Sequence, residues 1–130
     1  MPHFSIEYSG NIDADMAAFC HEISAVILAT GLFETGAIRV RAIRCDAYSV
    51  ADGLPENAFA DMNFRIGAGR SQDEKKRAGE AIFKSAQAFF AKQLSEPYFA
   101  LSLEIREIDA ELSWKKNTMH ARLRHGRDHV

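Results

Sequence analysis

The chain carries one pattern twice: alternating apolar and polar residues, then apolar residues at helical spacing, then a second alternation. In the first copy, residues 2–8 and 38–43 alternate, and residues 16–27 have apolar side chains every three or four positions. Alternation is typical of a strand with one buried face, and the longer spacing is typical of an amphipathic helix. Asp13 is the expected N-cap of this helix and Gly31 its expected end. The first half therefore predicts a β-α-β unit.

The second copy follows the same order. Residues 58–66 and 101–105 alternate, and a helical pattern runs along residues 78–90 between them. Ser71 and Glu74 have the spacing of a capping box, which predicts the helix start, and Pro97 is the expected stop. Because a helix crossover joins the two strands of each unit, those strands should be parallel.

Two such units predict an α/β (α+β) fold, in which four strands form a mixed sheet and two helices cover one of its faces. At 130 residues the chain is long enough for one domain with its own core and too short for two. We therefore expect a single domain over residues 1–130. Its parts are repeat one at about 2–45, repeat two at about 58–107 and a C-terminal arm at about 109–130.

Composition argues against several function classes. The 16 basic and 18 acidic side chains give a net charge of -2, which provides no overall attraction to nucleic acid or to an anionic membrane. No apolar run approaches the roughly 20 residues of a membrane span, and the first residues lack the layout of a signal peptide. We expect a cytoplasmic protein. Cys20 and Cys45 lie far apart without metal-binding spacing, which favours two buried free thiols.

The C-terminal residues offer competing chemistry that we weigh as weaker. The five histidines lack the spacing of a metal site, and "HGRDH" is better explained as part of a mobile tail than as a metal ligand set. Trp114 could stack on a base, but no further aromatic residues interleave with the basic ones around it. "GAGRS" lacks the lysine of a phosphate-binding loop. We therefore expect no metal, no cofactor and no nucleic-acid partner.

Pro2 directly follows Met1. In such a small-residue context the methionine is usually removed, and the chain would then begin with a secondary amine. That amine is either an ordinary processed terminus or a reactive group. If Met1 stays, the Pro2 nitrogen is an amide without usable basicity.

The predicted sheet face opposite the two helices, called the free face below, is neither clean core nor clean surface. Its polar residues are mixed with apolar ones and comprise Arg39, Arg41, Asp61, Asn63, Arg65 and Glu104. Such a face often lies against other subunits, and the same contact would protect the sheet edges. The sequence therefore predicts an oligomer.

Six segments in order carry a family resemblance: "MPHFSIEYSGNI", "ATGLF", "AIRVRA", "VADG", "RIGAGRS" and "LSLEIREIDAELSWKKNTMH". Together they resemble the 5-carboxymethyl-2-hydroxymuconate delta-isomerases of the tautomerase superfamily, from residue 1 to about residue 123. The resemblance implies a cofactor-independent isomerase of aromatic-compound degradation that acts on a small polycarboxylate. It also implies a homotrimer, with active sites around the N-terminal proline at subunit boundaries. Residues 114–123 would then pack on the trimer.

The resemblance makes Pro2 the catalytic candidate, and the chemistry explains the choice. Isomerising a 2-hydroxymuconate removes a proton from the 2-hydroxyl group and returns one at carbon 5, so one group must be first base and then acid. A free α-amino group, with a pKa near ~7.7 to 8.0 in model peptides, suits that double task. Burial and nearby arginines should favour its neutral form.

The resemblance also assigns substrate binding to Arg39 in "AIRVR" and to Arg70 in "GAGR", with Arg41 as a third candidate. The planar guanidinium binds a carboxylate through two parallel hydrogen bonds. Arg70 also precedes a helix start, which favours anions. The competing interpretations are an intersubunit ion pair for Arg39 and Arg41, and an ordinary surface arginine for Arg70.

Two other functions remain open at this point. Within the superfamily, the same proline and arginines serve decarboxylation or dehalogenation of small acids. The fold also serves as a non-catalytic, trimeric signalling protein, against which the isomerase-like segments argue. A tautomerase assay on a simple 2-hydroxydienoate separates these classes.

Overall fold

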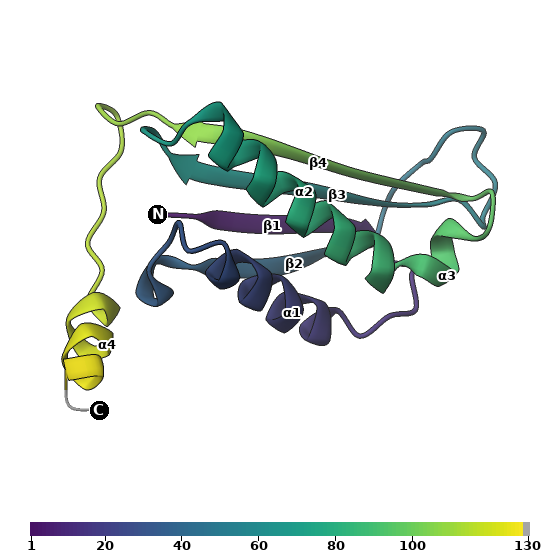
Figure 1. The fold of residues 1–130 in the computed structure, drawn as a ribbon. Helices are drawn as coiled ribbons and strands as arrows, with labels where there is room; N and C mark the ends of the chain where they lie inside the picture. Colours follow the sequence, from purple (N-terminus) through teal and green to yellow (C-terminus); the bar gives the residue numbers. More distant parts are fainter. Residues whose placement is uncertain (129–130) are drawn as a thin grey trace.

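The computed structural model describes residues 1–128, with side chains through residue 124, as a sheet with helices packed on one face (Figure 1). In chain order the elements are β1 (His3–Ser9), α1 (Met16–Ala29), the 3-10 helix η1 (Thr35–Ala37), β2 (Arg39–Cys45), β3 (Ala58–Gly67), α2 (Gln72–Phe89), α3 (Ala91–Leu94), β4 (Phe99–Ile108) and α4 (Met119–Asp128).

The sheet has four strands in the order β2-β1-β3-β4. β1 and β2 are parallel, β3 and β4 are parallel, and β1 and β3 are antiparallel. The two β-α-β repeats therefore meet through their first strands, which confirms the mixed sheet expected from the sequence. β2 and β4 are left as the edge strands.

The core lies between the sheet and the helices α1 and α2, which run across the same face (Figure 1). Aromatic rings join the layers: the centroid of Phe4 lies 6.4 Å from that of Phe19 on α1 and 6.0 Å from that of Phe64 on β3. Burial of these apolar side chains is the main stabilising contribution. The largest of them are Phe4, Ile6, Phe19, Ile23, Ile27, Met62, Phe64, Ile66, Ile82 and Phe90.

The helix ends confirm some expectations and correct others. The capping box of α2 is present, because Ser71 accepts from the Glu74 N–H and the Glu74 carboxylate accepts from the Ser71 N–H. Gly31, with a φ of 73°, follows the end of α1 as expected. The prediction of Asp13 as the N-cap of α1 was wrong, because Asp15 accepts the hydrogen bond from the Ala18 N–H at 3.0 Å.

The predicted end of α2, at Pro97, was also wrong because it lies too far along the chain. The helix ends at Phe89 because Phe90 leaves helical geometry, with φ -94° and ψ 23°, while its side chain is fully buried. The short α3 then precedes Pro97. Both cysteines are free, as expected, but they are half-buried rather than buried.

The C-terminal arm differs most from the sequence expectation. A tail was expected after residue 123, whereas α4 continues to Asp128. The "HGRDH" segment begins at residue 125, so its side chains lie outside the described residues. Among the helices of residues 1–128, none has the length and apolar character needed to cross a membrane.

Strand register aligns the free face in rows across the sheet. His3 pairs with Arg39 on one side and with Arg65 on the other, and Arg65 pairs with Arg106. Three arginines and one histidine therefore form a single row at the end of the sheet where β1 begins. Four residues further along β1, Glu7 pairs with Asp61. The free face is thus cationic at the N-terminal end of β1 and acidic toward its other end.

Candidate active site

Pro2 lies immediately before β1 and is buried. Its carbonyl oxygen accepts a hydrogen bond from the backbone N–H of Arg39 at 3.2 Å. This bond extends the β1–β2 pairing to the chain terminus. The first residues are therefore held at a fixed place at the end of the sheet.

A cavity of about 310 Å³ opens beside Pro2. One wall comes from the chain terminus and Arg70, a second from the segment around η1, and a third from the C-terminal arm. The lining residues are Met1, Pro2, Leu32, Phe33, Glu34, Ala37, Arg70, Lys115, Asn117 and His120. The structure thus brings Pro2 and Arg70 to the same cavity.

Arg70 is fixed on three sides at the edge of this cavity. Its guanidinium donates to the carbonyl oxygen of Leu32 at 2.9 Å and to that of Gly67 at 3.1 Å. The guanidinium carbon also lies 4.2 Å from the centroid of the Phe33 ring. The chain can place Arg70 here because Gly69 has a φ of 113°, a conformation open to glycine, between β3 and α2. Arg70 is therefore a preorganised cation.

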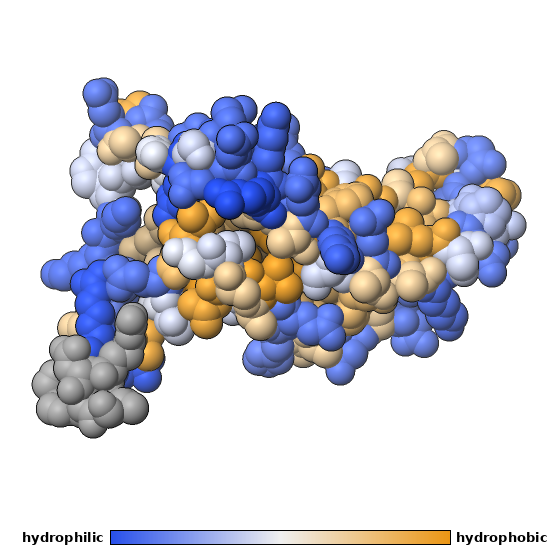
Figure 2. All heavy atoms as spheres, in the orientation of Figure 1, coloured by the Kyte–Doolittle hydropathy of each residue, from blue (hydrophilic) through white to orange (hydrophobic). Residues whose placement is uncertain are grey.

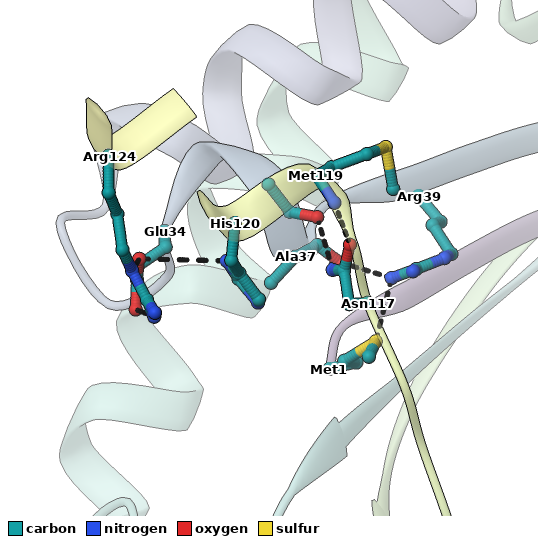
Figure 3. A network of polar contacts seen from close by, with 9 residues as sticks. Met1, Glu34, Ala37, Arg39, Asn117, Met119, His120 and Arg124 are labelled. Carbon is teal, nitrogen blue, oxygen red and sulfur yellow. Dashed lines mark hydrogen bonds and ion pairs between the residues drawn. The ribbon is translucent and has the colours of Figure 1, made fainter. Parts of the chain in front are cut away.

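Arg39 lies next to the cavity on the first residue of β2. Its Nη1 atom donates to the carbonyl oxygen of Ala37 at 2.9 Å and lies 2.8 Å from the sulfur of Met1 (Figure 3). Ala37 and Met1 both line the cavity. Met1 therefore lies between the Arg39 guanidinium and the site, and its removal would uncover that cation at the same time as it frees the Pro2 nitrogen.

Arg41 lies one row further along the free face, opposite Ser5 of β1. Its Nη1 atom is 3.4 Å from Nδ1 of His3, and the residue is exposed. It does not line the Pro2 cavity in the described chain. Of the three arginines expected at the site, Arg70 lines the cavity, Arg39 contacts two residues of its lining, and Arg41 lies apart from it.

The positive charges around the chain terminus lower the pKa values of the basic groups there. The pKa of the N-terminal amine of Met1 is lowered from its ordinary value, first by burial and then by the positive charges of Lys115, Arg70 and Arg39. The pKa of His3 is lowered as well, first by burial and then by Arg65, Arg41 and Arg39. Neutral bases and bound anions are both favoured in such surroundings.

Sequence reasoning missed the wall that the C-terminal arm contributes. Lys115, Asn117 and His120 line the cavity, although they follow the last strand and were expected only to pack on a trimer. Asn117 was the one available signal, since an asparagine side chain often hydrogen-bonds the backbone two residues on and so forms a turn. Among the side chains described through residue 124, no three of His, Cys, Asp or Glu are grouped as a metal site would require.

Comparison with known proteins shows which family the chain resembles. The model of the family described as 5-carboxymethyl-2-hydroxymuconate isomerase matches residues 2–123. A 5-carboxymethyl-2-hydroxymuconate Delta-isomerase of Escherichia coli is 37% identical over 123 residues, which cover 93% of this chain and 98% of the relative.

Solved structures of other proteins have a similar fold. The crystal structure of a 5-carboxymethyl-2-hydroxymuconate isomerase from Deinococcus radiodurans R1 superposes with a TM-score of 0.90 at 37% identity, and the match covers 94% of this chain and 93% of that one. A fused 4-OT solved as a symmetric trimer has a TM-score of 0.64 at 20% identity, covering 86% of this chain and 93% of that one. The latter likeness shows that the fold is tautomerase-like.

Proposed function

The chain belongs to the 5-carboxymethyl-2-hydroxymuconate isomerase family, and we propose that it converts 5-carboxymethyl-2-hydroxymuconate to its 2-oxo isomer without a cofactor. The reaction would be a step in the degradation of aromatic compounds. The observation that carries the proposal is the cavity shared by Pro2 and Arg70, with Arg39 beside it. A cytoplasmic location stays a prediction.

Pro2 is the proposed acid-base catalyst. Once Met1 is removed, its neutral amine takes the proton of the 2-hydroxyl group, the double bonds shift, and the ammonium form returns a proton to carbon 5. One O–H bond breaks and one C–H bond forms, so the amine ends as it began. The pyrrolidine ring restricts the direction of the lone pair, which helps to position it. The burial of Pro2 and the cations around it support this role.

Arg39 and Arg70 are the proposed carboxylate-binding residues. A guanidinium stays protonated beside an amine and offers two parallel N–H donors to a carboxylate. Arg70 is held in place by two carbonyl oxygens and the Phe33 ring, so its position does not need to reorganise when substrate binds. Arg41 stays a third candidate, and its role depends on contacts beyond the single chain.

We propose that the active protein is a homotrimer. The free face is rich in charged residues, and both β2 and β4 have unpaired edges in the described chain. Figure 2 shows apolar residues exposed in the middle of the helical side, among hydrophilic ones. A groove of about 790 Å³ between α2 and β4 exposes Phe83, Leu103 and Ile105. Contacts with neighbouring subunits would cover these surfaces.

Ultraviolet spectroscopy tests the function directly. The purified chain, with intact mass showing a start at Pro2, is mixed with 5-carboxymethyl-2-hydroxymuconate. We expect the dienol absorbance to decay to the 2-oxo product at a rate proportional to enzyme concentration. No acceleration over buffer, at concentrations where light scattering gives a trimer, would contradict the proposal. A stable monomer with full turnover would contradict the trimer and leave the reaction standing.

A further inference from the structure

The C-terminal arm crosses the end of the sheet at which β1 begins. In Figure 1 it runs from the end of β4, past the N-terminus, to α4 beside β2 and η1. Residues of this arm form one wall of the Pro2 cavity, as described above. The arm is therefore in a position to contact whatever the cavity holds.

Specific hydrogen bonds hold the arm in this position. The Asn117 side chain donates to the carbonyl oxygen of Gly36 at 2.7 Å and accepts from the Met119 N–H at 2.9 Å, so it joins the arm to η1 and closes a turn just before α4 (Figure 3). Nε of Arg124 donates to Glu34 at 2.7 Å, and Nη2 of Arg124 donates to the other oxygen of that carboxylate.

Close packing at Gly36 also fixes the arm. A Cβ atom at this position would lie 2.9 Å from Nδ1 of His120 and 3.3 Å from Cδ1 of Leu123, which is closer than ordinary contact allows. His120 in turn lies 3.6 Å from the Glu34 carboxylate. The helix α4 thus packs directly on the backbone of η1, and the residues just before it have a defined place.

Lys115 is the cation that this arrangement brings to the site. It lies two residues before Asn117 and lines the Pro2 cavity. It also lines a neighbouring cavity of about 490 Å³, together with His3 and Arg65 of the cationic row. Among the residues through 124, its ammonium group forms no ion pair with a carboxylate, unlike Lys75, which pairs with Glu107 at 2.9 Å. Its side chain instead contacts the terminal amine of Met1, so removal of Met1 would leave the Lys115 charge available to a ligand.

We propose that Lys115 is a substrate-binding residue that selects for a third carboxylate. The inference rests on the proposed function, because 5-carboxymethyl-2-hydroxymuconate has the two carboxylates of a muconate and one more on its carboxymethyl group. Arg39 and Arg70 account for two anionic groups. Lys115 supplies a third cation from the wall that the C-terminal arm forms, as a point charge on a flexible stem that suits a carboxylate on a methylene arm.

Paired substrates test this proposal. Lys115→Met removes the charge and keeps most of the side-chain length. We expect kcat/KM for 5-carboxymethyl-2-hydroxymuconate to fall on the order of 10- to 150-fold, mainly through KM, as for the loss of one charge-assisted contact. For 2-hydroxymuconate, which lacks the third carboxylate, we expect a change below about threefold. Rates are compared at a pH where they no longer vary with pH, so an altered Pro2 pKa does not contribute.

Two further variants separate charge recognition from structure. Lys115→Arg should restore most of the selectivity for the tricarboxylate. Lys116→Met changes the next lysine of the same arm, which lines neither cavity, and should leave both substrates unaffected. An equal loss for both substrates, or no loss for the tricarboxylate, would overturn the role of Lys115 while the isomerase function stands.

A binding measurement keeps the test independent of turnover. Calorimetry with the unreactive propane-1,2,3-tricarboxylate should show weaker binding to Lys115→Met than to wild type, with little change for butanedioate. If wild type isomerises neither dienol, the proposed function fails, and this comparison still decides whether Lys115 recognises a third carboxylate. Equal affinity of both proteins for the tricarboxylate would refute the proposal.

Discussion

The guanidinium carbon of Arg70 lies 4.2 Å from the centroid of the Phe33 ring, and both residues line the cavity beside Pro2. Two carbonyl oxygens accept hydrogen bonds from the same guanidinium. Because the cation is already held in place, little free energy is needed to reorient it when negative charge develops nearby. Such preorganisation is what stabilises a transition state.

Replacing Arg70 should therefore affect the chemical step. We expect Arg70→Ala to lower kcat, with a loss of about 1.5 to 3 kcal/mol, or roughly ten- to two-hundredfold in kcat/KM. Arg70→Lys keeps a charge but loses the planar group stacked on Phe33, and should recover only part of the rate. Steady-state kinetics give the answer, and a near-wild-type kcat/KM for the alanine variant would remove Arg70 from the site.

Replacing Arg39 should affect binding instead. Arg39 begins a rigid strand, and its guanidinium is positioned by the Ala37 carbonyl oxygen. It should hold a substrate carboxylate equally in the ground and transition states, so Arg39→Ala should mainly raise KM. Identical kinetic profiles for the Arg39 and Arg70 variants would contradict this division of roles.

The pH dependence of the reaction should reflect the cations around the terminus. Burial, Lys115, Arg70 and Arg39 lower the pKa of the N-terminal amine of Met1 below its ordinary 8.0, and the Pro2 amine would sit among the same groups. Because the neutral amine is the base, kcat/KM should rise with pH through that pKa and level off above it. The rising limb should therefore lie at lower pH than the ionisation of the N-terminal proline amine of a short peptide, measured in parallel.

Removing one of these cations should shift the pH dependence, and a variant at the next lysine serves as the control. Lys115→Met should raise the Pro2 pKa and move the rising limb to higher pH, whereas Lys116→Met, at a residue that lines neither cavity, should leave it in place. A wild-type limb that coincides with the ionisation of the peptide amine, or identical limbs for all three proteins, would show that these charges do not tune the Pro2 amine.

The capping box of α2 should contribute measurably to stability. Ser71→Ala removes the acceptor for the Glu74 N–H, and we expect it to lower the free energy of unfolding by about 1 kcal/mol. Ser85→Ala, in the middle of the same helix, is the control and should be neutral or slightly stabilising, since alanine favours helix. Urea denaturation at one protein concentration compares them, and equal midpoints for both variants would be inconsistent with the cap.

Much of the fold could be predicted because its elements bury one face each. Period-two alternation in β1, β3 and β4, and helical spacing in α1 and α2, reflect burial against a single layer. The end of α2 could not be predicted, because the burial of Phe90 and its contacts with distant rings decide it rather than Pro97. The sequence has no periodic pattern that predicts η1.

The candidate site could be predicted only in part. The residue types of Pro2, Arg39 and Arg70 pointed to their chemistry, but their proximity depends on strand register, in which His3 lies opposite Arg39. Lys115 could not be placed, because the arm reaches the site through long-range contacts such as that of Asn117 with Gly36. Sequence periodicity does not encode such contacts.

The character of the Pro2 amine can be varied by one substitution. Pro2→Ala keeps a free terminal amine, now primary and outside a ring, so it should reduce kcat/KM without abolishing it. The ring contributes position rather than the basic group itself. An inactive Pro2→Ala variant with a confirmed free terminus and unchanged circular dichroism would indicate that the ring is indispensable.

The most direct test compares two proteins that differ by a single residue: the chain starting at Pro2 and the chain that retains Met1. Retained Met1 makes the Pro2 nitrogen an amide and leaves a thioether 2.8 Å from Arg39. With intact mass confirming each terminus and light scattering confirming equal assembly, we measure kcat/KM for 5-carboxymethyl-2-hydroxymuconate. Free Pro2 should support isomerisation, and retained Met1 should reduce it by at least about a hundredfold. Equal activity of the two proteins would contradict acid-base catalysis by Pro2.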